Sequence, residues 1–128
     1  MKALIIEDVR VNQRMLHKIL SKYGTCHMAQ NGTEGFDLFI NAQNNEEPYD
    51  VIFLDILMPG IDGLKLLKKI RTVDGEANKV RVIMATSVAD AKSVNEALKI
   101  GCDGYLIKPY QVDKIQQLLT KFEMIENQ

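Results

Sequence analysis

The stretch from Val51 to Gly63, VIFLDILMPGIDG, places a single carboxylate, Asp55, at the end of an apolar run. The four residues before Asp55 are typical of a buried strand, and the Pro-Gly and Asp-Gly pairs behind it indicate turns. A buried carboxylate is costly unless it is paired, protonated or bound to a metal. At the tip of a strand it avoids that cost, because it can face a crevice and take part in chemistry there.

Polar side chains follow other short apolar runs of the chain in the same way. They are Glu7 and Asp8 after the first run, Thr86 at the end of the fourth and Lys108 at the end of the fifth. Ligands of an open α/β sheet bind outside the carboxyl ends of its strands, so these side chains are expected to converge at one edge. Three carboxylates, a hydroxyl and an ammonium group would then meet in one site.

This set of groups suits the transfer of a phosphoryl group. Clustered carboxylates repel one another, and a hard divalent cation removes that repulsion. Mg²⁺ prefers oxygen ligands, uses one or two carboxylates and bridges to phosphate oxygens, to which a lysine and a hydroxyl can also bind. A carboxylate held in this setting can attack phosphorus, so Asp55 would be the nucleophile. Positioning and charge neutralisation would then account for most of the rate of the transfer.

Five short apolar runs and five helical patterns alternate along the chain and would position these groups. The predicted strands are residues 2–6, 25–30, 51–55, 80–86 and 104–108. Apolar residues three and four positions apart predict a helix after each strand. The alternation predicts an α/β fold in which helices cover both faces of a five-stranded parallel sheet.

Several details of the helices are also predicted. The first helix should bury Val11 and Met15 with Leu16, Ile19, Leu20 and Tyr23, and the fourth should bury Ala91, Val94, Ala97 and Leu98. Residues 41–50 are expected to form a polar surface loop. The basic residues of the third helix are expected to be solvated; they are Lys65, Lys68, Lys69 and Arg71.

The bulk composition indicates one soluble globular domain. The chain has 128 residues, of which 46% are hydrophobic and 26% are charged. Sixteen basic residues oppose seventeen acidic ones, which gives no electrostatic reason to expect nucleic acid or a membrane as partner. The two cysteines lie far apart and indicate neither a disulfide framework nor a zinc site. No signal peptide is evident, so a cytoplasmic location is expected.

The motifs IIED, FLDILMPGIDG, MATS and GYLIKPY resemble, in order and spacing, those of response-regulator receiver domains, the phosphoacceptor modules of two-component signalling. The resemblance implies a CheY-like, flavodoxin-like sheet with strand order 2-1-3-4-5. It implies that Asp55 is phosphorylated and that Thr86 and Lys108 bind the phosphoryl oxygens. The groups it implies as Mg²⁺ ligands are Glu7, Asp8, Asp55 and the backbone carbonyl of Leu57.

The resemblance also assigns roles in switching. Tyr105 matches an aromatic switch position, where the ring would turn inward once the phosphoryl group draws in the Thr86 hydroxyl. Pro109 matches a position where the peptide bond is commonly cis. Leu57 and Val88 match positions that influence the lifetime of the phosphoryl group. Both are apolar and cannot orient water, so we hypothesise a long-lived phosphorylated state.

The resemblance further implies partners. A histidine kinase or histidine phosphotransfer protein would supply phosphohistidine, and a target protein would bind the surface of the fourth helix, fifth strand and fifth helix. The chain would catalyse only its own phosphorylation and dephosphorylation. Residues 1–128 are expected to form a single receiver domain without an effector domain. The alternative is a receiver domain excised from a hybrid histidine kinase or a larger response regulator.

Two other classes of protein fit the sequence less well. A small phosphatase with an aspartyl-phosphate intermediate would carry an Asp-x-Asp motif near its start, whereas Asp55 is central and is followed by Ile56 and Leu57. A flavin carrier would need a loop rich in Ser, Thr and Gly after the first strand, where this chain has the acidic sequence EDVRVN. His17 and His27 are assigned no role.

Overall fold

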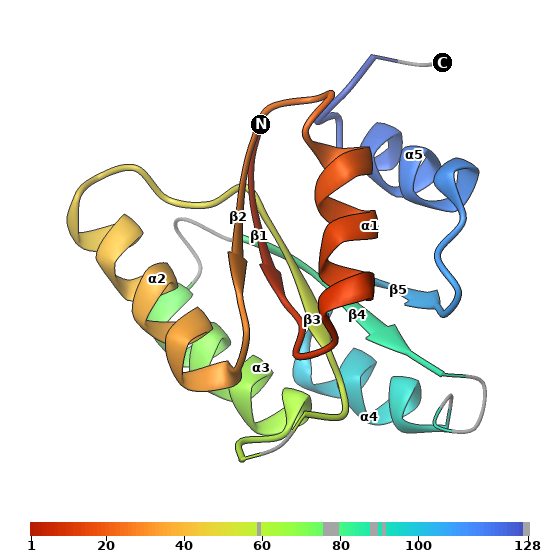
Figure 1. Cartoon of the computed structure of the whole chain (residues 1–128). Coiled ribbons are helices and arrows are strands. Elements are labelled where there is room, and N and C mark those ends of the chain that lie inside the picture. The colour runs from red at the N-terminus through yellow and green to blue at the C-terminus, as the bar shows by residue number, and fades with distance from the viewer. Residues whose placement is uncertain (59, 76–79, 88–89, 91, 127–128) are drawn as a thin grey trace.

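The computed structural model describes residues 1–58, 60–75, 80–87, 90 and 92–126, in which five strands and five helices alternate (Figure 1). The strands are β1 (Lys2–Ile6), β2 (Thr25–Ala29), β3 (Val51–Asp55), β4 (Arg81–Thr86) and β5 (Gly104–Ile107). The helices are α1 (Arg10–Leu20), α2 (Gly32–Asn44), α3 (Gly63–Asp74), α4 (Ser93–Ile100) and α5 (Val112–Lys121). The predicted strands are confirmed to within one residue at each end.

All strand pairs are parallel, and the sheet has the order β2-β1-β3-β4-β5. This confirms the predicted doubly wound fold. The chain passes from β1 outward to β2 and then returns across β1 to β3, so the strand order reverses at this point. The carboxyl ends of β1 and β3 therefore flank the crevice in which such sheets bind their ligands.

The two faces of the sheet carry separate cores. In β3, Val51 and Phe53 pack with residues of α1 and α5, whereas Ile52 and Leu54 pack with residues of α2, α3 and α4. Figure 1 shows the same division, with α1 and α5 on one side of the sheet and the other three helices opposite. This alternation is why the central strands are apolar at nearly every position.

The prediction for the buried face of α1 was partly wrong. Val11 and Met15 are exposed by 65% and 41%, whereas Gln13 is only 6% exposed. Gln13 lies three residues before Leu16 and so shares the buried face. Its amide donates to the backbone oxygens of Glu7 and Ala29, which allows a polar side chain to be buried there.

Other predictions outside the sheet are also corrected. Residues 41–44 are helical, because α2 continues to Asn44. Leu98 is exposed, while Ala91 lies outside the described residues. Arg71 is not solvated: its guanidinium donates to the backbone oxygens of Gly101 and Val80 at 2.8 and 2.6 Å. The tertiary partners of Arg71 arrive from beyond its own helix, so the helical pattern could not reveal them.

Two further features concern one peptide bond and the lengths of the helices. The Lys108–Pro109 peptide bond is cis, as the resemblance implied. Within the described part of the chain, no helix is both long enough and apolar enough to cross a membrane.

Candidate functional site

The connection from β3 to α3 is built tightly around the end of β3. Asp62 caps α3, since its side chain accepts a hydrogen bond from the backbone N–H of Lys65 at 2.9 Å. The N–H of Gly63 donates to the carbonyl of Ile56 at 2.8 Å. A Cβ atom at position 63 would lie 2.3 Å from the backbone oxygen of Asp55. Glycine at this position therefore allows the first turn of α3 to lie against the residue that ends β3.

Lys108 joins the ends of three strands. Its Nζ lies 2.9 Å from Oε1 of Glu7, after β1, and 3.0 Å from Oδ2 of Asp55, at the end of β3. Glu7 and Asp55 are 1% and 5% exposed. Charge-assisted contacts of this length stabilise buried carboxylates that would otherwise be strongly disfavoured. The predicted convergence of these three residues is therefore observed.

The two buried carboxyl groups differ in pKa. Burial raises the pKa of Asp55 to about 7, and the neighbouring Glu7 adds to the rise, while Lys108 opposes it. The pKa of Glu7 is lowered, because its hydrogen bonds with Asp55 and Lys108 outweigh the effect of burial. Burial alone would lower the pKa of Lys108, but the two carboxyl groups raise it. Between the lowered pKa of Glu7 and the raised pKa of Asp55, the two carboxyl groups therefore share one proton.

Two residues that hold Glu7 in place were missed from the sequence. The hydroxyl of Tyr110 donates to Oε1 of Glu7 at 3.4 Å, and burial raises the pKa of Tyr110. The amide of Gln13 donates to the backbone oxygen of Glu7. The spacing of Gln13 to Leu16 could have indicated its burial. The motif GYLIKPY contains Tyr110 but gives no sign of its partner.

A cavity of about 190 Å³ opens beside Asp55 at this edge of the sheet. Thr86 lies on its wall, and its hydroxyl donates to the carbonyl of Ser87 at 3.1 Å. The backbone N–H of Leu57 donates to Oδ1 of Asp55 at 3.3 Å. The described residues that line it are Asp8, Val9, Asp55, Leu57, Thr86, Ser87, Asp90 and Lys108.

The acidic residues of this site fit a hard cation. Glu7, Asp8 and Asp55 each offer an oxygen atom, and these atoms lie within 4.8 Å of one another. Within the residues that the structure describes, they are the one acidic, histidine or cysteine group with this arrangement. Glu7 and Asp55 are buried while Asp8 is exposed, so a cation here would have protein oxygens on one side and water on the other.

Two more of the predicted residues are Tyr105 and Val88. Tyr105 is 47% exposed and lines a separate cavity of about 500 Å³ with Ile107 and Gln111. Tyr105 is therefore not a core residue in this structure. Val88 lies outside the described residues.

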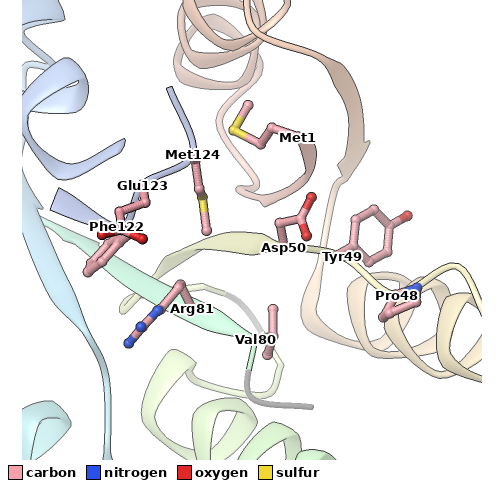
Figure 2. A pocket seen from close by; sticks show the side chains of 9 residues that line it. All are labelled: Met1, Pro48, Tyr49, Asp50, Val80, Arg81, Phe122, Glu123 and Met124. Carbon is pink, nitrogen blue, oxygen red and sulfur yellow. The ribbon is translucent and has the colours of Figure 1, made fainter. Parts of the chain in front are cut away.

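A second large cavity, of about 510 Å³, lies at the opposite edge of the sheet, where β3 and β4 begin (Figure 2). Its wall includes Asp50 and Arg81. Asp50 already accepts a hydrogen bond from the backbone N–H of Lys2 at 2.7 Å, and Arg81 pairs with Asp103 at 3.2 Å. The cavity is separate from the carboxylate site, and these two charged groups are already paired within the protein.

The model of the response regulator receiver domain family matches residues 3–120. The chain therefore belongs to this family, and it is a receiver domain of the kind used in two-component signalling. The family identification agrees with the strand order and with the acidic site at the carboxyl edge of the sheet.

The chain is similar to parts of long proteins and to whole short ones. It is 34% identical to the osmosensing histidine protein kinase SLN1 of Saccharomyces cerevisiae. The similar stretch covers 94% of this chain but only 10% of that protein. It is 31% identical to the chemotaxis protein CheY of Listeria monocytogenes, over 94% of this chain and 97% of that protein. A receiver domain protein from Clostridium thermocellum has a similar structure, with a TM-score of 0.81, 25% identity and coverage of 94% and 92%.

Proposed function

We propose that Asp55 accepts a phosphoryl group from a phosphohistidine of a partner protein, and that this modification switches a protein-binding surface. The observation that supports it most directly is the position of the Lys108 ammonium, within 3.0 Å of both Asp55 and Glu7 beside an open cavity. Family membership supports the same reaction, since receiver domains accept phosphoryl groups from histidine kinases.

In the proposed reaction, an oxygen of the ionised Asp55 carboxylate attacks phosphorus. The bond from phosphorus to the imidazole nitrogen breaks, and the histidine of the partner leaves with the bonding electrons. Lys108 then exchanges its contact with Asp55 for one with the transferred oxygens, and Thr86 turns its hydroxyl from Ser87 toward them. The strand ends hold these groups in place before the donor arrives, which reduces the entropy lost on reaction.

Mg²⁺ is the proposed cofactor. Glu7, Asp8, Asp55 and the carbonyl of Leu57 would hold it, and the clustering of three carboxylate oxygens supports this assignment. When bound, the ion would neutralise the carboxylates and the charge of the transferred phosphoryl group. Asp55 would then be ionised at neutral pH, where its pKa otherwise leaves it partly protonated.

The proposed output is a change at the surface formed by α4, β5 and α5. Turning of the Thr86 hydroxyl would leave room for the ring of Tyr105 to move inward, which is a shift between two populations of conformers. Exposed apolar side chains on these elements support a protein-binding role for the surface: Leu98, Tyr105, Ile107 and Val112. A histidine kinase or phosphotransfer protein remains the proposed donor, and the cytoplasm the proposed location.

The relatives include both CheY proteins and much longer histidine kinases. Action without an effector domain therefore stays a prediction, as does the alternative of an excised domain. In either case the chain would catalyse only its own phosphorylation and dephosphorylation.

The test is incubation with phosphoramidate and Mg²⁺, followed by intact-mass analysis. Wild type should gain one phosphoryl group, while Asp55→Asn and wild type with excess EDTA should not. Circular dichroism of the Asn variant would verify that it is folded. Labelling that persists in Asp55→Asn would place the acceptor at another residue.

A further inference from the structure

Asp90 lies at the wall of the same cavity as Asp55, and the mechanism above gives it no role. It comes from the connection between β4 and α4, whereas Asp55 and Lys108 come from strand ends. The hydroxyl of Ser87 donates to its Oδ2 at 2.7 Å, and its own N–H donates to the carbonyl of Ser87 at 3.1 Å. The carboxylate is therefore held in place beside the cavity.

This carboxylate could hold a water molecule beside a phosphoryl group on Asp55, which the side chain of Leu57 in the same wall cannot do. A phosphoryl group on Asp55 is lost when water attacks phosphorus, and the water must be held in line for that attack. The side chain of Leu57 is apolar and cannot hold it. A carboxylate is an acceptor with about four lone-pair sites, of which Ser87 occupies one in Asp90. The remaining sites can accept hydrogen bonds from a water molecule in the cavity.

Charge also favours a water molecule between Asp90 and the phosphoryl group. Direct contact would bring a carboxylate against phosphoryl oxygens, and like charges at that range repel. A water molecule that donates to Asp90 removes the direct contact, and its oxygen lone pair is then free to face phosphorus. A carboxylate in this position favours hydrolysis over a stable phosphorylated state.

We propose that Asp90 orients the water molecule that hydrolyses the phosphoryl group on Asp55; this rests on the function proposed above. The oxygen of water bonds to phosphorus, and the bond from phosphorus to the Asp55 oxygen breaks. Asp55 leaves as a carboxylate, and both protons of the water end on the product, which is dihydrogen phosphate. Asp90 gains no net proton. The phosphorylated state is then shorter-lived than the apolar Leu57 alone implies.

A purely structural role for Asp90 must be distinguished from this one. The two hydrogen bonds between Ser87 and Asp90 would hold these two residues together whether or not Asp90 binds water. Asp90→Asn separates the two roles, because the amide oxygen can still accept from Ser87, while an NH₂ donor replaces the second carboxylate oxygen, which would accept from the water, and the charge is removed. Glu96→Gln, on the exposed surface of α4, is the matched control for loss of one negative charge.

The experiment measures two rates for wild type and both variants by intact mass. The first is labelling by phosphoramidate with Mg²⁺, in which no water attacks. The second is loss of the label after the donor is removed. We expect Asp90→Asn to lose the label about 5–10 times more slowly, at the low end of what an acid–base group contributes. Its labelling should be as fast as in wild type or faster, and Glu96→Gln should match wild type in both rates.

Two results would overturn the inference. One is loss of label from Asp90→Asn at the wild-type rate or faster. The other is a parallel decrease in labelling and loss, because a structural change in the cavity would alter both reactions. In each case wild type still becomes labelled at Asp55, so the proposed function stands. A wild-type protein that gains no label would instead refute the proposed function, and this inference with it.

Discussion

Lys108 carries one positive charge and faces two buried carboxyl groups, Glu7 and Asp55. If both groups are ionised, the buried cluster has an excess negative charge, which is unfavourable away from water. Without a cation the cluster removes that charge by protonation, so the pKa of Asp55 rises to about 7. The site is thus balanced between binding a proton and binding a cation, which would suit the proposed reaction of Asp55 in the presence of a metal ion.

Replacement of Asp55 by asparagine should stabilise the protein in the absence of Mg²⁺. Between the ordinary carboxyl pKa of about 4 and the folded-state pKa of about 7, the native protein holds a proton that the unfolded chain has lost. The free energy of unfolding of wild type therefore falls as pH rises through this window and levels off above it. Asp55→Asn has no carboxyl group to ionise at this position, so its free energy of unfolding does not fall in this way. Above neutral pH it should exceed that of wild type by about 1–3 kcal/mol.

Urea denaturation in EDTA at about pH 5 and about pH 8 measures this difference. Asp8→Asn is the control, because the side chain of Asp8 is exposed and its replacement should have a smaller effect. An advantage of Asp55→Asn that is the same at both pH values would show that a cause other than ionisation of Asp55 is responsible.

At the scale of elements, the site residues that could be predicted from the sequence are those at the ends of strands. Glu7, Asp55 and Lys108 were identified because apolar runs end at them, and parallel strands bring their carboxyl ends to one edge. Gln13 and Tyr110 were missed for a physical reason. Whether a polar side chain is buried depends on partners from other elements, and periodicity along one segment does not contain that information.

The first turn of α3 should be the element most sensitive to a small added side chain. In Gly63→Ala, the Cβ atom would lie 2.3 Å from the backbone oxygen of Asp55 and 2.7 Å from Cα of Ile56. Backbone atoms cannot turn away as a side chain can, so β3 or α3 has to shift. We expect a loss of about 2–4 kcal/mol in the free energy of unfolding, together with slower labelling of Asp55.

Gly104→Ala is the matched control. Its Cβ would be 3.0 Å from the side chain of Leu118, which can move, so the expected loss is about 1 kcal/mol or less. Denaturation and labelling by phosphoramidate measure both effects. Equal stability of the two variants would show that the contact at position 63 is relieved without cost.

At the scale of the whole molecule, the two edges of the sheet carry different groups of charged residues. The carboxyl edge holds the acidic site and its cavity. At the opposite edge, Asp103 pairs with Arg71 at 2.7 Å and with Arg81 at 3.2 Å, and also accepts from the N–H of Val82 at 2.9 Å. These contacts connect α3, β4 and the start of β5 without reaching Asp55. Stability and chemistry should therefore be separable by substitutions at the two edges.

Asp103→Ala should destabilise the fold and leave the chemistry intact. It removes the nearer of two carboxylates that pair with Arg71, whose side chain is only 13% exposed, while Asp74 stays 3.5 Å away, so a loss of about 1–3 kcal/mol is expected. The rate of labelling at Asp55, measured at a temperature where the variant is folded, should equal that of wild type. Asp37→Ala, at an exposed position of α2, should change stability by less than about 0.5 kcal/mol. A labelling defect in folded Asp103→Ala would show that the two edges are coupled.

The conformational switch can be tested with one fluorescent residue, because the chain contains no tryptophan. Tyr105 is 47% exposed in the present structure, so the indole of Tyr105→Trp should initially report a largely aqueous environment. If phosphorylation draws the Thr86 hydroxyl inward and the ring follows, the emission should move to shorter wavelength when phosphoramidate and Mg²⁺ are added. The double variant with Asp55→Asn should not respond, because it lacks the proposed acceptor. A protein shown by intact mass to be fully phosphorylated, but with unchanged emission, would mean that the signal leaves the site by a route other than Tyr105.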